Sequence, residues 1–270
     1  MLNPTINQEN VTKLLLMLGN SYQVVDKSIS LIHFGSTVNK IDSLPLDIDI
    51  LVLSENEYVD KKSKIKKMRK GLLNGKAFSG FRTHYPKIEK ITSEIILNQH
   101  FFSKVDIIPK FVFGPFKYDA TKKKDRIYLH FKGPLTTEEF LFFFNQLPFH
   151  GISIIENGYP IIGSLPFKKR LSNFRVSIDL LREFNKGLYL RVRESSNPHD
   201  IKKCIKKLIM NLDIYNRYSL TANNELSHIL PIRNEPNIKL LNITEDIEIL
   251  RNFFITTYMK IEKMNSRYRT

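Results

Sequence analysis

Two aspartates that are separated by a single residue, Asp47 and Asp49, lie in a run of apolar residues. Side chains at positions i and i+2 of a strand point to the same face, so both carboxylates would project side by side. Magnesium prefers oxygen ligands and is commonly held by one or two carboxylates together with substrate phosphates. As two solvated strand residues, the aspartates would repel each other without a cation between them. The pair therefore predicts a magnesium site.

The pair Gly35-Ser36 directly follows the apolar segment 30–34, and ten residues separate it from Asp47. A glycine lets the backbone approach phosphates closely, and the serine hydroxyl and nearby amides can donate hydrogen bonds to them. We expect Gly35 and Ser36 to bind the phosphates of a nucleoside triphosphate such as ATP. Two magnesium ions roughly 3.5–4 Å apart would activate the attacking hydroxyl and stabilise the pyrophosphate that leaves.

This order of residues, with HFGS at His33–Ser36 and DIDI at Asp47–Ile50, resembles the signature of the DNA polymerase β-like nucleotidyltransferase superfamily. The similarity covers about residues 28–110. It implies a small mixed sheet flanked by helices, an appended helical domain, and two bound magnesium ions, with manganese as the alternative metal. It also implies a third carboxylate, on a neighbouring strand, that helps to bind the metal activating the nucleophile. Asp106, in the sequence Val-Asp-Ile, is the candidate for it.

Three basic residues near these aspartates are candidates for binding the triphosphate or the backbone of an RNA acceptor. Lys66 and Arg69 belong to a helical pattern after the Asp-x-Asp segment, and Lys110 follows Asp106 by four residues. Bacterial abortive-infection and toxin nucleotidyltransferases of the AbiEii and MenT kind are similar in carrying basic residues at these two places. The sequence leaves a second interpretation open, in which the run around Lys66 is the solvated face of an amphipathic helix.

The chain is strongly basic, with 42 Lys and Arg against 27 Asp and Glu and a net charge of +15. Such a balance raises the local concentration of polyanions, which include nucleic acids and nucleotides. A composition rich in Lys, Ile and Asn can also result from genome bias alone. The clustering of seven basic residues between residues 61 and 70 favours the first interpretation.

Other features of the composition exclude several classes of protein. The single cysteine, Cys204, cannot form an internal disulfide or a structural zinc site. No apolar run approaches the ~20 residues needed to cross a bilayer, and the first residues lack the basic start and apolar core of a signal peptide. We therefore expect a cytoplasmic protein with no membrane partner.

Hydrophobic periodicity divides the chain near residue 166 into a part with strands and helices and a purely helical part. Together with the resemblance, this predicts an α+β fold with a nucleotidyltransferase domain over residues 1–166 and a helical domain over residues 167–270. Strands are expected at 30–34, 47–53, 94–97, 105–108 and 126–131, and Asn157-Gly158 predicts a hairpin within 152–162. Helices are expected at 7–26, 56–73, 171–186, 198–216 and 244–263.

The sequence thus predicts a metal-dependent nucleotidyltransferase that moves a nucleoside monophosphate from its triphosphate to an acceptor hydroxyl and releases pyrophosphate. The net charge favours RNA as the acceptor, in particular a tRNA modified by a toxin-like enzyme that has a cognate antitoxin. A small molecule such as an aminoglycoside is the alternative acceptor, for which Glu138-Glu139 is the only obvious acidic pair in its region. A non-catalytic module that binds nucleic acid is the alternative class, although three intact carboxylates argue against it.

Overall fold

The computed structural model describes residues 7–38, 46–56, 81–82, 84–98, 102, 105–113, 125–165, 167, 171, 174–219 and 243–263. Apart from its first residue, the helix predicted at 56–73 lies outside these ranges. The described residues form two compact units, one that ends at residue 171 and one that begins at residue 174.

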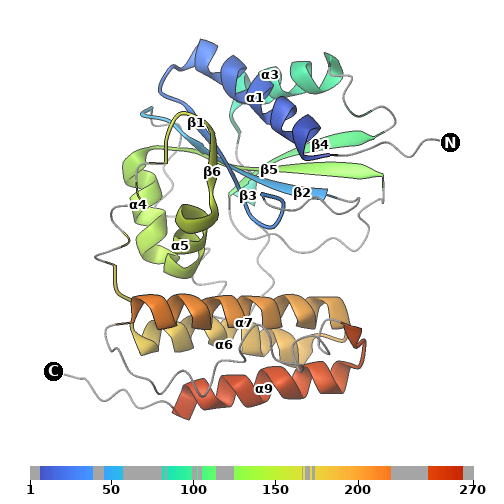
Figure 1. Ribbon diagram of the computed structural model, residues 1–270, viewed down its shortest axis with the longest axis vertical. Coiled ribbons are helices and arrows are strands. Elements are labelled where there is room, and N and C mark those ends of the chain that lie inside the picture. The colour runs from blue at the N-terminus through green and yellow to red at the C-terminus, as the bar shows by residue number, and fades with distance from the viewer. Residues whose placement is uncertain are drawn as a thin grey trace. The chain divides into compact units, whose positions relative to one another are not determined.

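Within the described residues, the first unit contains a six-stranded mixed sheet with the strand order β3-β4-β5-β2-β1-β6 (Figure 1). Its strands are β1 (Ser30–Phe34), β2 (Leu46–Leu53), β3 (Phe81–Arg82), β4 (Asp106–Phe113), β5 (Arg126–Leu135) and β6 (Tyr159–Ile162). β5 runs parallel to β2 and β4, while β1, β3 and β6 are antiparallel to their neighbours. This confirms an α+β fold with a mixed sheet flanked by helices, and the strands predicted at 30–34, 47–53, 105–108 and 126–131.

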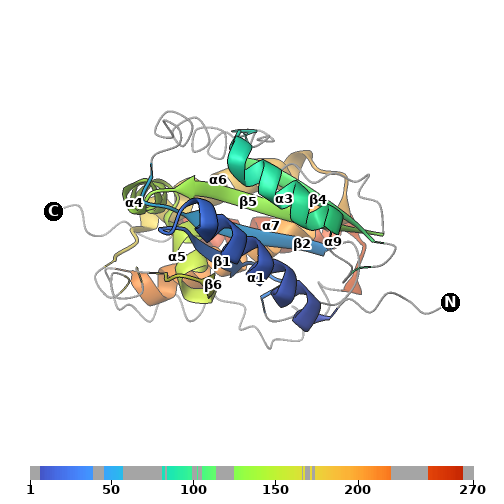
Figure 2. The same ribbon diagram turned by 90° about the horizontal axis from the view of Figure 1, so that it is seen from above.

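Two helices, α1 (Gln8–Val25) and α3 (Pro86–Asn98), cover one face of this sheet (Figure 2). The apolar residues of α1 recur every three or four positions and pack on alternate residues of the central strands, among them Ile48 and Ile50 of β2 and Leu129 and Phe131 of β5. Because side chains alternate along a strand, the residues between these positions point to the opposite face. The buried face therefore determines which residues of β2 and β5 remain available for chemistry.

Two further helices, α4 (Thr137–Gln146) and α5 (Pro148–Asn157), follow β5 and lie on the other side of the sheet (Figure 1). Phe140, Phe143 and Phe144 of α4 are buried and form a packed helix face. His150 of α5 packs edge-on against Phe34 of β1, with 6.3 Å between the ring centroids. This contact places α5 beside the second face of the sheet, at the end of β1.

The described part of the second unit contains the helices α6 (Ile178–Glu194), α7 (Pro198–Tyr218) and α9 (Ile247–Lys263). Their apolar faces pack together, and a buried hydrogen bond of 2.9 Å joins the side chains of Asn185 and Asn211. The helices predicted at 198–216 and 244–263 are confirmed, whereas the one predicted at 171–186 begins at residue 178 and continues to residue 194. Among the helices described, none combines the length and the apolar character that a membrane span requires.

One strand prediction was wrong, because residues 94–97 belong to α3. The helix starts at Pro86, and the Glu89 side chain accepts a hydrogen bond from the backbone N–H of Tyr85 at 3.0 Å. Ile88 and Thr92, four residues apart, face the core. A run of four residues is too short to distinguish a period of two from a period of 3.6.

The hairpin predicted at Asn157-Gly158 was also wrong, because the residues before Gly158 form α5 and only β6 after it is a strand. The N–H of Gly158 donates to the carbonyl oxygen of Ile154 at 2.7 Å, which ends the helix. A Cβ at this position would lie 2.4 Å from the same oxygen. The glycine is therefore needed for a close backbone approach at a helix end, a role that the dipeptide pattern alone does not distinguish from a turn.

Asp26, at the end of α1, is hydrogen-bonded to residues next to β1 and β2, two strands that pair antiparallel. Its carboxylate accepts hydrogen bonds from the N–H and Oγ of Ser28 and from the side chains of Ser54 and Asn56, at 2.6–3.0 Å. Burial raises the pKa of Asp26, but these hydrogen bonds outweigh it and hold the pKa well below its usual value. The ionised carboxylate thereby links the start of β1 to the end of β2.

We predict that Asp26→Asn lowers the free energy of unfolding at pH 7 by about 1–2 kcal/mol, because hydrogen bonds to an ionised acceptor are lost. A depressed pKa in the folded state contributes stability that is present above the unfolded pKa of about 3.9 and is lost as the pH falls below it. The difference between variant and wild type should therefore shrink towards pH 2, as measured by urea denaturation. Glu94→Gln, on an exposed ion pair, is the control, and a pH-independent effect of Asp26→Asn would contradict the prediction.

Candidate metal and phosphate site

β2 places the carboxylates of Asp47 and Asp49 on the face opposite to α1 and α3. Ile48 between them is fully buried in the core, as is Ile50 after them. The side chain of Asp47 is 40% exposed and that of Asp49 is 28% exposed. The two carboxylates therefore share one partly open face, as the alternation of apolar and acidic residues predicts.

Gly35 brings the loop after β1 directly against one of these carboxylates. Its φ is +88°, a conformation that residues with a Cβ rarely adopt, and a Cβ there would lie 2.8 Å from Oδ2 of Asp49. Ser36, the next residue, is exposed. The structure thus brings together Gly35, Ser36 and the Asp-x-Asp pair, although ten residues separate them along the chain.

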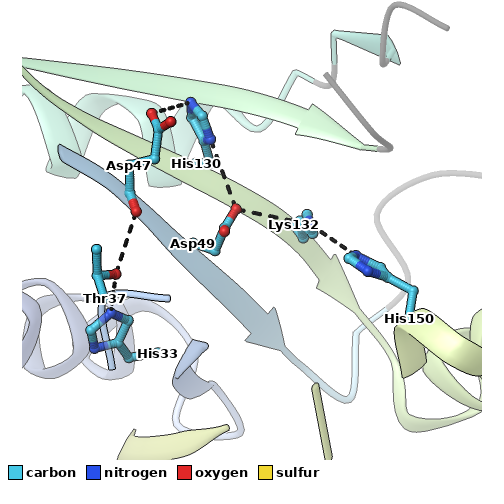
Figure 3. A network of polar contacts seen from close by, with 7 residues as sticks. All are labelled: His33, Thr37, Asp47, Asp49, His130, Lys132 and His150. Carbon is cyan, nitrogen blue, oxygen red and sulfur yellow. Dashed lines mark hydrogen bonds and ion pairs between the residues drawn. The ribbon is translucent and has the colours of Figure 1, made fainter. Parts of the chain in front are cut away.

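A buried hydrogen-bonded chain fixes this loop to β2. Nε2 of His33 lies 2.9 Å from the hydroxyl of Thr37, which in turn donates to the backbone oxygen of Asp47 at 3.4 Å (Figure 3). Burial lowers the pKa of His33 to about 4, against the opposing charge of Asp49, so the imidazole is neutral at pH 7. His33 therefore positions the loop as an uncharged hydrogen-bonding group.

Two residues of β5 that the sequence analysis missed, His130 and Lys132, complete the polar face. His130 pairs in register with Asp49, and its Nδ1 and Nε2 atoms lie 3.8 Å from Oδ1 of Asp49 and Oδ1 of Asp47 (Figure 3). Nζ of Lys132 lies 4.0 Å from Oδ1 of Asp49 and 3.0 Å from Nε2 of His150. A signal for them exists, because polar residues at 128, 130 and 132 alternate with apolar ones as they do in β2.

The charge of Asp49 is balanced by this surrounding network. Burial raises the pKa of Asp49, but the charges of Lys132 and His130 outweigh it and bring the pKa below its ordinary value. Burial lowers the pKa of Lys132, which Asp49 opposes. Asp49 is therefore ionised at neutral pH.

Asp106, the candidate third carboxylate, lies one strand further away. It begins β4, which is separated from β2 by β5, and it pairs in register with Arg126. Nε of Arg126 lies 3.3 Å from its Oδ2, and the Asp106 side chain is 63% exposed. The strand register places Asp106 on the same face as Asp47, but β5 occupies the position next to β2 that the resemblance implies for a third carboxylate.

Of the three basic residues expected to bind phosphate, the described ranges contain only Lys110. It lies in register with His130, and its Nζ stands 4.6 Å from the centre of the Tyr128 ring. Lys110 therefore shares the polar face with the Asp-x-Asp pair, two strands away. Lys66 and Arg69 fall outside the described residues.

The carboxylates on this face are suited to a magnesium ion whose remaining ligands come from the substrate and water. Among the residues described, no three His, Cys, Asp or Glu side chains already form a group that could hold a metal ion. Magnesium is commonly bound by one or two carboxylates, with phosphate oxygens and water as the other ligands. Asp47 and Asp49 can supply the two carboxylates, and the Gly35 backbone beside Asp49 leaves no side chain in the way of a phosphate.

Comparisons with protein-family models, curated proteins and solved structures find no match to this chain. The function must therefore be inferred from the geometry of the site.

We predict that Lys132→Met lowers the free energy of unfolding by about 2–3 kcal/mol in metal-free buffer, because a partly buried carboxylate loses its cation. Asp49→Asn in the same background should restore part of this loss, since no charge then requires a partner. Urea denaturation of the two single variants and the double variant measures both effects. Lys110→Met is the control, with an expected change below about 1 kcal/mol from a lost cation–π contact. Unchanged stability of Lys132→Met would show that the charge of Asp49 is balanced elsewhere.

Proposed function

We propose that the protein is a metal-dependent nucleotidyltransferase, and that its α+β unit has the nucleotidyltransferase fold. In this proposal it transfers a nucleoside monophosphate from a nucleoside triphosphate to an acceptor hydroxyl and releases pyrophosphate. The observation that carries the proposal is the contact between Gly35 and Asp49. A loop suited to phosphate lies against a carboxylate suited to metal, on a strand whose neighbouring carboxylate points the same way.

The residues have separate tasks in this reaction. The exposed hydroxyl of Ser36 and the backbone at Gly35 would bind the β- and γ-phosphates. Asp47 and Asp49 would hold two magnesium ions, which supply charge stabilisation to the attacking and leaving oxygens when bound. Lys110, together with Lys66 and Arg69, would neutralise the remaining phosphate charge.

Lys132 and His130 prepare Asp49 for this task. Their charges favour the ionised carboxylate in a position where burial alone would favour the protonated form. Nε2 of His150 lies 3.0 Å from Nζ of Lys132, a hydrogen-bond distance, and so limits the directions that the Lys132 side chain can take. A carboxylate that is already ionised and oriented does not have to reorganise when a metal nucleotide arrives.

RNA is the acceptor that the chain supports best, and a tRNA is the first to test. The net charge of +15 favours a polyanion. An aminoglycoside would require an acidic pocket, but one member of the candidate pair, Glu139, is engaged in capping the first turn of α4. There Glu139 and Thr136 form a reciprocal capping box, in which each side chain accepts from the backbone N–H of the other. A toxin role with a cognate antitoxin is an extension of the same proposal.

We predict that Asp47→Asn and Asp49→Asn each reduce label transfer at least about a hundredfold, because removing even outer partners of a metal ligand costs 10–100-fold. The measurement is transfer of phosphorus-32 from α-labelled nucleoside triphosphates, with magnesium, to total tRNA and to a pool of small acceptors. Transfer of label to tRNA supports RNA as the acceptor. Transfer to the pool of small acceptors instead shows that the acceptor is a small molecule.

Asp125→Asn is the matched control, since this exposed carboxylate stands immediately before β5 and outside the site. It should transfer label at the rate of the wild type. Asp106→Asn, in the same assay, tests the third carboxylate expected from the sequence. Substantial label transfer by the Asp47→Asn, Asp49→Asn double variant would show that these two aspartates are not the catalytic site. If the wild type transfers no label from any of the four nucleotides, the alternative of a non-catalytic module that binds nucleic acid is favoured.

A further inference from the structure

The outer face of α7, in the second unit, carries a row of basic side chains. Lys203, Lys206 and Lys207 stand four, seven and eight residues after His199, which are the spacings of one side of a helix. His199, Lys206 and Lys207 are exposed, and Lys203 is half-buried. Because an α-helix rises 1.5 Å per residue, the side chains from 199 to 207 extend over about 12 Å. We call Lys203, Lys206 and Lys207 the α7 lysine row.

The opposite face of α7 is occupied by the interior of the second unit. Ile201, Leu208 and Leu212 are fully buried there, and α7 packs against both α6 and α9. A helix that binds to a lipid surface inserts an apolar face into it. Since the apolar face of α7 is already buried, its outer face offers a partner mainly charge.

The two acidic residues of α7 stand on either side of the lysine row. Asp200 lies 3.0 Å from Nη2 of Arg191 on α6, and Asp213 lies 3.2 Å from Nη2 of Arg217 on α7 itself. No acidic residue occurs between Asp200 and Asp213 in the sequence. The lysine row is thus a stretch of positive charge between two carboxylates that are each paired with an arginine.

The charges of the row act together on the residue that precedes them on the same face. Burial lowers the pKa of His199, and the charges of Lys203 and Lys206 lower it further, while Asp200 opposes them. A positive potential shared by several side chains raises the local concentration of anions. The outer face of α7 therefore suits a partner that presents several negative charges along its length.

We propose that the α7 lysine row binds the phosphate backbone of RNA. The inference rests on the RNA acceptor of the proposed function, and it adds a binding surface in the second unit that requires neither metal nor nucleotide. Lysine ammonium groups contact phosphates as point charges and read no base, so the row binds RNA of any sequence. RNA is favoured over a lipid surface because the apolar face of α7 is buried in the bundle.

The test is the binding of fluorescently labelled tRNA to the full chain, without metal or nucleotide, measured by anisotropy over a range of salt concentrations. In the triple variant Lys203→Gln, Lys206→Gln, Lys207→Gln, the slope of log affinity against log salt should decrease by about 2–3, because each lost phosphate contact removes roughly 0.7–0.9. The affinity at fixed salt should fall accordingly.

The matched control is the triple variant Lys13→Gln, Lys87→Gln, Lys90→Gln, which removes the same charge from exposed positions of α1 and α3 in the first unit. Its slope should differ from that of the wild type by less than about 1, the value expected for a single phosphate contact. An equal decrease in both triple variants would show that net charge alone binds RNA, and would overturn the inference.

A second measurement uses the wild-type chain, so that it does not depend on whether a variant folds. Lysines are acetylated with and without tRNA, and the modified positions are read by mass spectrometry. We expect tRNA to protect the α7 lysine row and to leave Lys87 and Lys90 as reactive as before. A row that stays equally reactive in the presence of bound tRNA would contradict the inference.

The remaining outcomes separate this inference from its rivals and from the proposed function. Binding to vesicles of anionic lipid that is lost in the α7 variant, while tRNA binding persists, would assign the row to a membrane surface instead. If the α7 variant loses RNA binding but the wild type transfers no label, the inference stands and the proposed reaction fails. If label enters tRNA but the α7 variant binds tRNA like the wild type, the proposed function stands and the inference fails.

Discussion

The complete burial of one face of β2 and β5 is the constraint on which the rest of the first unit depends. Ile48, Ile50, Leu129 and Phe131 are fully removed from solvent beneath α1 and α3. A shift of either strand by one residue would exchange its two faces, which would place carboxylates in the core and isoleucines in the site. The hydrophobic core therefore sets the register of the two strands. That register in turn determines which polar side chains lie next to each other on the opposite face.

The polar face concentrates opposite charges in a small volume. Asp49 lies within 4.0 Å of both an imidazole and an ammonium group. Opposite charges that are partly withdrawn from water stabilise each other only while both are present, so removing one leaves the other at a cost. A divalent cation at Asp49 would enter in competition with Lys132. The network thus supplies positive charge beside Asp49 and keeps this carboxylate ionised.

The sequence predicted the local features of the site and missed those that depend on pairing between distant strands. Local sequence patterns predicted the strands next to Gly35 and around Asp49. The structure brings these two residues into contact. That β5 lies between β2 and β4 depends on pairing over long distances in the chain, for which no local signal exists. His130 was missed for this reason, whereas Asp106 stays a prediction that follows from the resemblance. The end of helix α3 was predicted as a strand because its apolar run is short. Helix α5 was predicted as part of a hairpin because a glycine such as Gly158 occurs both in hairpin turns and at helix ends.

The separation of β2 and β5 along the chain has a consequence for synthesis on the ribosome. β2 ends at Leu53 and its central partner begins only at Arg126. Contacts between distant segments form slowly, because a long loop must close before they give any stability. Gly35, Asp47 and Asp49 therefore leave the ribosome before β5 does. At that stage the nascent chain contains these residues but not the sheet that holds them in place. The polar face can be assembled only after β5 has emerged, so the order of translation delays its formation until at least residue 135 has left the ribosome.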